Sequence, residues 1–282
     1  MHDDYQGSVD FGYANMSFSE RVSAAFELAK FHFWSIFITQ IVVGLVMFIL
    51  AFIGSMIFGS LFYMMINAGL TGVHMPVGAT LGILGLYIVL GLVSSYFSLG
   101  IFSLVLKYVD DLQPEGGVIN QVLLPWYNFL PLLVCFLVWG GLVFGFFVAL
   151  GLVALIPYLG ILIYLIGLVI YWMILISLFM FLADNMRAGV GAAISTPVLL
   201  VKDNPTSFLS ALLVAFVSYL PGIILVGLCI KLIENSTGSA LLFLFISLVY
   251  FLAASVYVLI YFGITYRQTY GGNFSSVVEQ VF

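Results

Sequence analysis

Neutral polar side chains inside long apolar stretches are the residues of this sequence best suited to a membrane function. One amide and four hydroxyl groups gather in the first two stretches: Gln40, Ser94, Ser95, Tyr96 and Ser98. Together they could form a polar seam that lines a path for a small neutral solute or holds a lipid headgroup. Such groups also form hydrogen bonds between membrane helices, each worth under about 1–2 kcal/mol. We weigh helix packing above a solute path, because the motif Gly141-x-x-x-Gly145 also favours close helix packing.

Charged side chains are kept away from the middle of every apolar stretch. Lys107 and Asp184 stand at stretch ends, and Lys231 and Glu234 flank another end. Charges inside a bilayer are costly, and where they occur they usually mark proton relays or ion paths. This distribution argues against a proton- or sodium-driven transporter and against an intramembrane acid–base enzyme.

Motifs of catalysis and metal binding are missing from the sequence. It contains no phosphate loop, no nucleophile elbow, no H-E-x-x-H and no paired-cysteine spacing. His74 stands beside Met75 without a second ligand at helical spacing, and an ordinary loop histidine is the simpler interpretation. Cys135 and Cys229 fall in apolar stretches, where thiols behave as small hydrophobic groups. We therefore expect no catalytic residue, no metal site, no cofactor and no enzymatic activity.

The composition requires a lipid environment for these residues. Of 282 residues, 64% are hydrophobic and 7% are charged, whereas soluble domains are about 45–50% apolar and about 25% charged. A soluble globular domain and a disordered chain are both excluded. Twelve acidic residues against seven Lys and Arg leave no basic surface that would bind nucleic acid. The sequence predicts an integral membrane protein embedded in a lipid bilayer.

The apolar stretches are long enough for six membrane helices. A crossing needs roughly 20 apolar residues, and the stretches cover 34–62, 81–106, 131–182, 208–232 and 240–262. The third is long enough for two crossings, with Pro157 as the natural reversal point. The stretches are too long for the strands of a barrel. We predict an all-α protein with six transmembrane helices arranged as three hairpins.

The distribution of lysine and arginine predicts the orientation. With six crossings, six of the seven fall on one side: Arg21, Lys30, Lys107, Arg187, Lys202 and Arg267. The positive-inside rule places that side, with both termini, in the cytoplasm. We expect the inner (cytoplasmic) membrane of a prokaryote. The predicted regions are a cytoplasmic tail and amphipathic interfacial helix (1–33), the membrane domain (34–264) and a cytoplasmic tail (265–282).

Each predicted hairpin is preceded by a short cytoplasmic amphiphilic segment. Before the first, Ser17 and Glu20 form a capping box, and before the second lies the aromatic segment 122–129. Before the third, Thr196 is expected to cap a short helix that starts at Pro197. Asn204-Pro205 then begins the fifth membrane helix, since proline favours a first helical position. The three segments are equally well explained as an internal repeat and as coincidence.

Two terminal segments carry exposed apolar side chains that should dock on a surface. The candidates are Phe11 and Tyr13 in the N-terminal tail and Phe274, Val278 and Phe282 in the C-terminal tail. The C-terminal residues follow a helical spacing. The membrane surface, the protein's own helices and a partner subunit are the alternatives. The N-terminal tail is equally compatible with disorder.

Segments of the C-terminal half resemble a known group of membrane proteins. These are 156–160 (IPYLG), 192–208 (AAISTPVLLVKDNPTSF) and 256–267 (VYVLIYFGITYR). They resemble uncharacterised prokaryotic six-helix membrane proteins, which are similar to the membrane domain fused to some glycerophosphodiester phosphodiesterases. The resemblance implies a six-helix fold and an accessory role. It transfers no catalytic residue, because the chain has no phosphodiesterase domain.

Together these observations favour a non-enzymatic scaffold or accessory subunit of a membrane complex. Its partners would be the bilayer and a protein partner or further copies of the chain within the membrane. The alternative is a permease or channel for a small neutral or lipid-like solute, lined by the serine and tyrosine seam.

Overall fold

The fold is described by a computed structural model over residues 16–57, 59, 63, 67, 77–114, 116–154, 156, 159–233 and 237–271. Every regular element among these residues is a helix. Six of the helices are long and apolar enough to cross a membrane. The prediction of an all-helical chain with six membrane-length helices is confirmed, which indicates a multi-pass membrane protein.

In the described part of the chain, two short helices are interspersed among the six long ones. The long helices are α1 (Phe18–Ile57), α3 (Val77–Val109), α5 (Phe129–Ala154), α6 (Leu159–Asp184), α8 (Pro205–Ile233) and α9 (Thr237–Gly271). The short helices α4 (Val118–Tyr127) and α7 (Val190–Asp203) directly precede α5 and α8. Helices α1 and α9 continue across the domain boundaries expected after residues 33 and 264.

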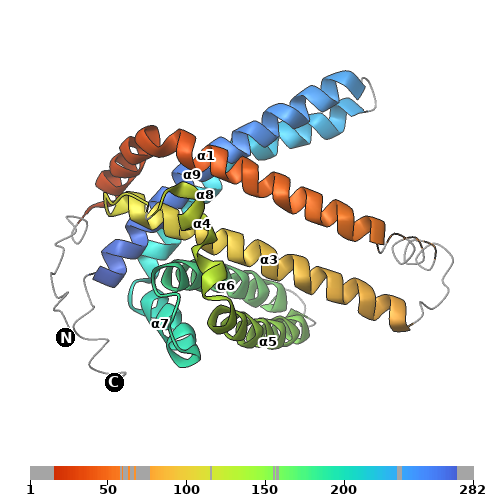
Figure 1. The fold of residues 1–282 in the computed structure, drawn as a ribbon, viewed down its shortest axis with the longest axis horizontal. Coiled ribbons are helices and arrows are strands. Elements are labelled where there is room, and N and C mark those ends of the chain that lie inside the picture. Colours follow the sequence, from red (N-terminus) through yellow and green to blue (C-terminus); the bar gives the residue numbers. More distant parts are fainter. Residues whose placement is uncertain are drawn as a thin grey trace.

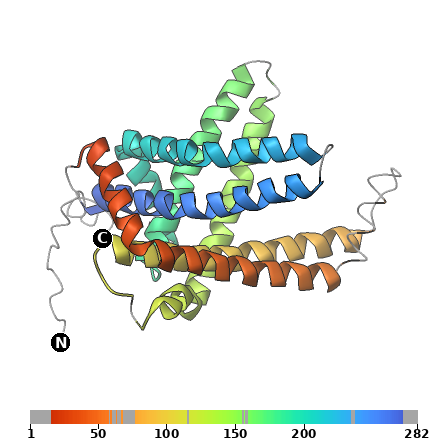
Figure 2. The ribbon, with the colours of Figure 1, turned by 90° about the horizontal axis from the view of Figure 1, so that it is seen from above.

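The long helices meet at one end and diverge at the other. Neighbours along the chain pack together: α1 with α3, α5 with α6, and α8 with α9. Helix α9 also contacts α1, α3 and α6. Figure 1 shows α1 with α3 and α8 with α9 extending to the right from this shared end, and Figure 2 shows α5 and α6 running across the other four long helices. The core lies at the shared end, around the fully buried Tyr96, Met180 and Tyr266.

The diverging parts of the helices expose large apolar side chains. Phe48 of α1 is 68% exposed, Phe144 of α5 is 74% exposed and Phe245 of α9 is 63% exposed. In water such surfaces would drive association. In a bilayer they are the expected lipid contacts, because the surrounding hydrocarbon is as apolar as the side chains.

The capping prediction is confirmed for α1 and wrong for α7. The Ser17 N–H donates to Glu20 Oε2 at 2.6 Å, and the Glu20 N–H donates to Ser17 Oγ at 3.4 Å. Helix α7, by contrast, begins at Val190, so Thr196 and Pro197 lie in its interior instead of at its start.

A tryptophan explains how α7 contains an internal proline. Pro197 has no N–H, so it leaves the carbonyl of Ala193, one turn earlier, without its helical donor. The indole N–H of Trp139 in α5 donates to that carbonyl at 2.9 Å. Because a partner from another helix replaces the missing donor, the helix continues through the proline, which local sequence rules do not foresee.

The Trp139→Phe change should lower the free energy of unfolding by about 1–3 kcal/mol, because it leaves a buried carbonyl without a donor. Pro197→Ala restores the helical N–H, so it should recover much of that loss in the Trp139→Phe background. Trp172→Phe, at a site that is 49% exposed, is the control. Denaturant unfolding in detergent measures all four proteins. Equal losses for the two tryptophan changes, or no recovery with Pro197→Ala, would contradict this account.

The small-residue motif predicted to allow close packing does not do so in this chain. A Cβ atom built on Gly141 or Gly145 meets no atom within 4 Å. Among the described glycines, the tightest backbone approach is at Gly100, where a Cβ would overlap the Val122 carbonyl oxygen of α4. The short helix α4 packs against α3 and creates this contact. The sequence of α3 taken by itself does not indicate it.

Candidate functional site

The C-terminal end of α3 is shaped so that Asp110 is held at a defined position. The N–H of Asp111 donates to the Tyr108 carbonyl at 3.2 Å, and the N–H of Leu112 donates to the Lys107 carbonyl at 2.8 Å. Asp111 has φ 54°, in the left-handed region. This is a Schellman arrangement, which ends the helix and satisfies its last carbonyls. Asp110 is therefore fixed as the last residue before the chain reverses.

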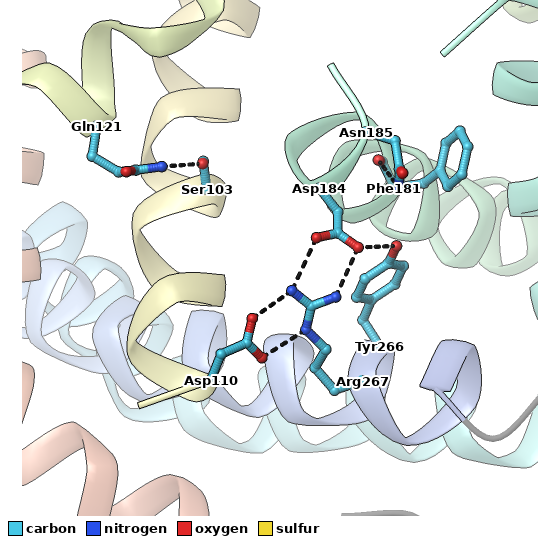
Figure 3. Close-up of polar contacts among 8 residues, drawn as sticks. All are labelled: Ser103, Asp110, Gln121, Phe181, Asp184, Asn185, Tyr266 and Arg267. Atoms are coloured by element: carbon cyan, nitrogen blue, oxygen red, sulfur yellow. Dashed lines mark hydrogen bonds and ion pairs between the residues drawn. The ribbon is translucent and has the colours of Figure 1, made fainter. Parts of the chain in front are cut away.

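Arg267, in the last turns of α9, joins the ends of three helices (Figure 3). Its Nη2 and Nε donate to Asp110 at 2.6 and 2.8 Å. Its Nη1 and Nη2 donate to Asp184, the last residue of α6, at 2.7 and 2.9 Å. The hydroxyl of Tyr266 donates to Asp184 Oδ2 at 3.1 Å. The exposed side-chain fractions are 11% for Arg267, 6% for Asp110 and 22% for Asp184. We call Asp110, Asp184 and Arg267 the charged triad.

The electrostatics of the charged triad make the arginine essential. Both carboxylates lie at helix C-termini, where the helix dipole is negative and disfavours further negative charge. Burial raises the pKa of Asp110 above its ordinary value, while the hydrogen bonds and charge of Arg267 oppose that shift. A planar guanidinium bonds two carboxylates through separate edges, which a lysine cannot do. The triad thus holds the ends of α3, α6 and α9 together.

A cavity of about 590 Å³ opens beside the charged triad. Besides the triad, its polar lining includes Lys107, Gln121, Asn128 and Arg187. Gln121 Nε2 donates to Ser103 Oγ at 2.6 Å, and Arg187 Nε donates to Asn128 Oδ1 at 3.4 Å. Charges of both signs therefore face one space, which suits a polar or zwitterionic group. Over the part of the chain that the structure describes, no cluster of His, Cys, Asp and Glu is placed to hold a metal ion.

The polar residues singled out from the sequence have separate hydrogen-bond partners. Gln40 Oε1 accepts from Ser255 Oγ of α9 at 2.8 Å. Ser95 Oγ donates to the Gly91 carbonyl of its own helix at 2.8 Å. The Tyr96 hydroxyl donates to the Phe129 carbonyl of α5. Ser94 is exposed and Ser98 is half-buried. None of the five predicted residues lines the cavity beside the charged triad.

The predicted docking residues cannot be placed in the fold. Phe11, Tyr13, Phe274, Val278 and Phe282 lie outside the described residues. Their role stays a prediction.

Sequence reasoning missed the charged triad, although a signal for it exists. Asp110, Asp184 and Arg267 each lie at the C-terminal end of a crossing that is even in number. In a six-helix topology these ends fall on the same side of the membrane. Pairing opposite charges that are predicted at the same membrane depth would have suggested a contact between Arg267 and these aspartates. It would not have shown that Arg267 bonds both of them.

Comparisons of the chain with protein-family models, with curated proteins and with solved structures find no match. The resemblance noted from the sequence therefore stays an expectation, and the function has to be argued from the geometry.

Proposed function

We propose that this protein is a non-enzymatic scaffold or accessory subunit of a membrane complex. The observation that carries the proposal is the arrangement of the six long helices, which are joined at one end and diverge at the other (Figures 1 and 2). The charged triad and the buried core hold the shared end together. The diverging helices offer apolar faces to lipid or to the membrane helices of another subunit. A tightly packed shared end, from which helices with apolar faces extend, suits assembly with other membrane subunits better than catalysis.

In this proposal the shared end faces the cytoplasm, and α4 and α7 lie at that membrane surface as segments introducing the second and third hairpins. The lysine and arginine distribution supports it, because Lys107, Arg187, Lys202 and Arg267 all belong to that end. A cysteine placed at position 74 should react with an impermeant thiol reagent only from the outside of intact cells. Labelling from the cytoplasm alone would overturn the orientation.

Site-specific photo-crosslinking in native membranes tests the scaffold role. A photoreactive amino acid replaces Phe144 or Phe245 on the apolar faces, with Glu27, on an exposed polar face, as the control position. A scaffold should give one dominant protein adduct of constant mass from the apolar positions and none from position 27. Native mass spectrometry should show the same partner or a further copy of the chain at fixed stoichiometry. Adducts to lipid alone, combined with solute flux in reconstituted vesicles, would replace the scaffold by a transport function.

A permease or channel for a small neutral or lipid-like solute is the second candidate, and the cavity beside the charged triad is the observation that favours it. Purified protein in vesicles should then pass such a solute. Ser94 and Ser98 do not line this cavity, so the double change Ser94→Leu and Ser98→Leu tests whether the path also runs along the predicted seam: the flux should be lost if it does. Unchanged flux in the double variant would exclude them from it.

A further inference from the structure

The first turn of α1 carries a buried arginine that meets no carboxylate in the described part of the chain. Arg21 is only 7% exposed. Its Nη2 donates to Ser210 Oγ of α8 at 3.4 Å, the long end of the hydrogen-bond range. Its Nε and Nη1 have no hydrogen-bond partner. Its guanidinium carbon lies 5.7 Å from the centre of the Tyr261 ring of α9.

These contacts are too weak to account for the burial of a full positive charge. Removing a guanidinium from water is costly unless a counter-charge and hydrogen bonds replace the lost solvation. For Arg267, by comparison, bonds to two carboxylates replace the solvation that its guanidinium loses on burial. Arg21 has one long hydrogen bond and one aromatic ring. Its surroundings therefore favour an anion that this part of the chain does not supply.

The neighbouring groups add further donors for an anion. The hydroxyl of Tyr261 is buried and has no hydrogen-bond partner among the described residues. Ser210 lies in the second turn of α8, which begins at Pro205. The positive end of that helix dipole is therefore close to Arg21. An arginine, the tyrosine ring that carries this hydroxyl and a helix start, from three different helices, thus lie at one corner of the fold.

The apolar surroundings and the total charge indicate which anion it is. Phe18, whose ring packs against Tyr261, is 49% exposed, and Leu209, the neighbour of Ser210 in α8, is 53% exposed. This corner therefore presents apolar surface beside its cationic group. The chain has a net charge of −5, so its overall field does not concentrate free anions. A phosphate attached to acyl chains is held at the bilayer surface regardless of that field, and anionic lipids attract local cationic groups.

We propose that Arg21 and Tyr261, together with the start of α8, bind the phosphate group of an anionic phospholipid. The free N–H groups of Arg21 and the Tyr261 hydroxyl donate to the phosphate oxygens. The acyl chains lie along the exposed apolar side chains of α1 and α8. Phe18, which packs edge-on against Tyr261 at 6.5 Å between ring centres, covers this corner and rotates outward to admit the headgroup. The site needs a phospholipid but no protein partner, so it stands apart from the scaffold role.

Thermal unfolding of the purified full-length chain in a neutral detergent tests the site. Phosphatidylglycerol should raise the melting temperature of the wild-type protein by several degrees, whereas phosphatidylcholine and inorganic phosphate should not. Arg21→Gln should remove the shift. Lys30→Gln is the matched control: Lys30 lies on the same helix, but its side chain is 55% exposed and it pairs with Glu27. This control should keep the full shift.

Tyr261→Phe keeps the test decisive if Arg21→Gln does not fold. It removes only an unpartnered hydroxyl, so it should fold and show a reduced phosphatidylglycerol shift. Native mass spectrometry should find bound phosphatidylglycerol on wild type and on Lys30→Gln, and less of it on Tyr261→Phe. A shift with inorganic phosphate alone would identify a free-anion site and overturn the lipid assignment. Equal shifts with both lipids, or a full shift in Arg21→Gln or in Tyr261→Phe, would overturn the site itself.

Discussion

Replacing Arg267 by glutamine should lower the free energy of unfolding by about 3–5 kcal/mol, because it leaves the buried carboxylate of Asp110 and the partly exposed carboxylate of Asp184 without their cation. Asp110 and Asp184 are only 6% and 22% exposed, and both stand at the negative ends of helices. The expected result is a protein that loses its monodisperse peak at a much lower temperature. Size-exclusion chromatography after heating to a series of temperatures measures the temperature at which this peak is lost. Arg267→Lys should rescue little, since an ammonium group does not bond both carboxylates through separate edges.

Two further variants separate the charge effect from a general loss of packing. Arg187→Gln removes an arginine of the same cavity that is exposed and makes a 3.4 Å hydrogen bond, so it should change stability little. Adding Asp110→Asn and Asp184→Asn to Arg267→Gln removes the uncompensated carboxylates and should recover stability. Equal behaviour of the Arg267 and Arg187 variants, or no recovery in the triple variant, would show that the charged triad does not join the three helices.

Gly100→Ala should displace α4 from α3 and lower the free energy of unfolding by about 1–3 kcal/mol or more through overpacking. The new Cβ would overlap the Val122 carbonyl oxygen and lie 2.9 Å from the Val122 Cα, and no side-chain rotation can move these two backbone atoms. Gly116 and Gly117, with φ 67° and 92°, make the turn that brings α4 back to this place. The displacement should also alter the cavity, because Gln121 of α4 lines it.

Crosslinking measures that displacement directly. In a background with Cys135→Ala and Cys229→Ala, cysteines replace Ser103 and Gln121, whose side chains lie 2.6 Å apart. A short bifunctional thiol reagent should join them efficiently, and Gly100→Ala should reduce the yield several-fold. Gly91→Ala is the matched control on the same helix, since a Cβ added at Gly91 meets no atom within 4 Å. An unchanged yield with Gly100→Ala would contradict the close approach of the two helices.

Both predictions concern the shared end, which the proposed scaffold needs more than any single apolar face. Loss of the charged triad frees the end of α9 from α3 and α6. Displacement of α4 removes the support of the chain that enters α5. A variant with either change that still gave the wild-type photo-crosslinks would place partner recognition on the diverging helices alone.

The sequence alone determined the number and type of the long elements. Apolar length decides whether a segment crosses a membrane, because unsatisfied backbone groups are not tolerated in hydrocarbon. The break between α5 and α6, the start of α8 at Pro205 and the capping box at Ser17 follow from local backbone chemistry. Each of these features depends on residues within a few positions of one another, which the sequence displays directly.

Only the tertiary structure decided which polar and small residues make contacts between helices. Gly100 looks like other glycines of α3 until α4 folds onto it, and Pro197 is tolerated only because Trp139 comes from another helix. In the sequence, Arg21 and Arg267 look alike as positive charges expected on the same side of the membrane, yet Arg267 meets two carboxylates and Arg21 meets a tyrosine ring and a serine. Ser210 lies 189 positions from Arg21, and Asp110 lies 157 positions from Arg267. Contacts at that separation depend on how the helices cross, which no local pattern of residues specifies.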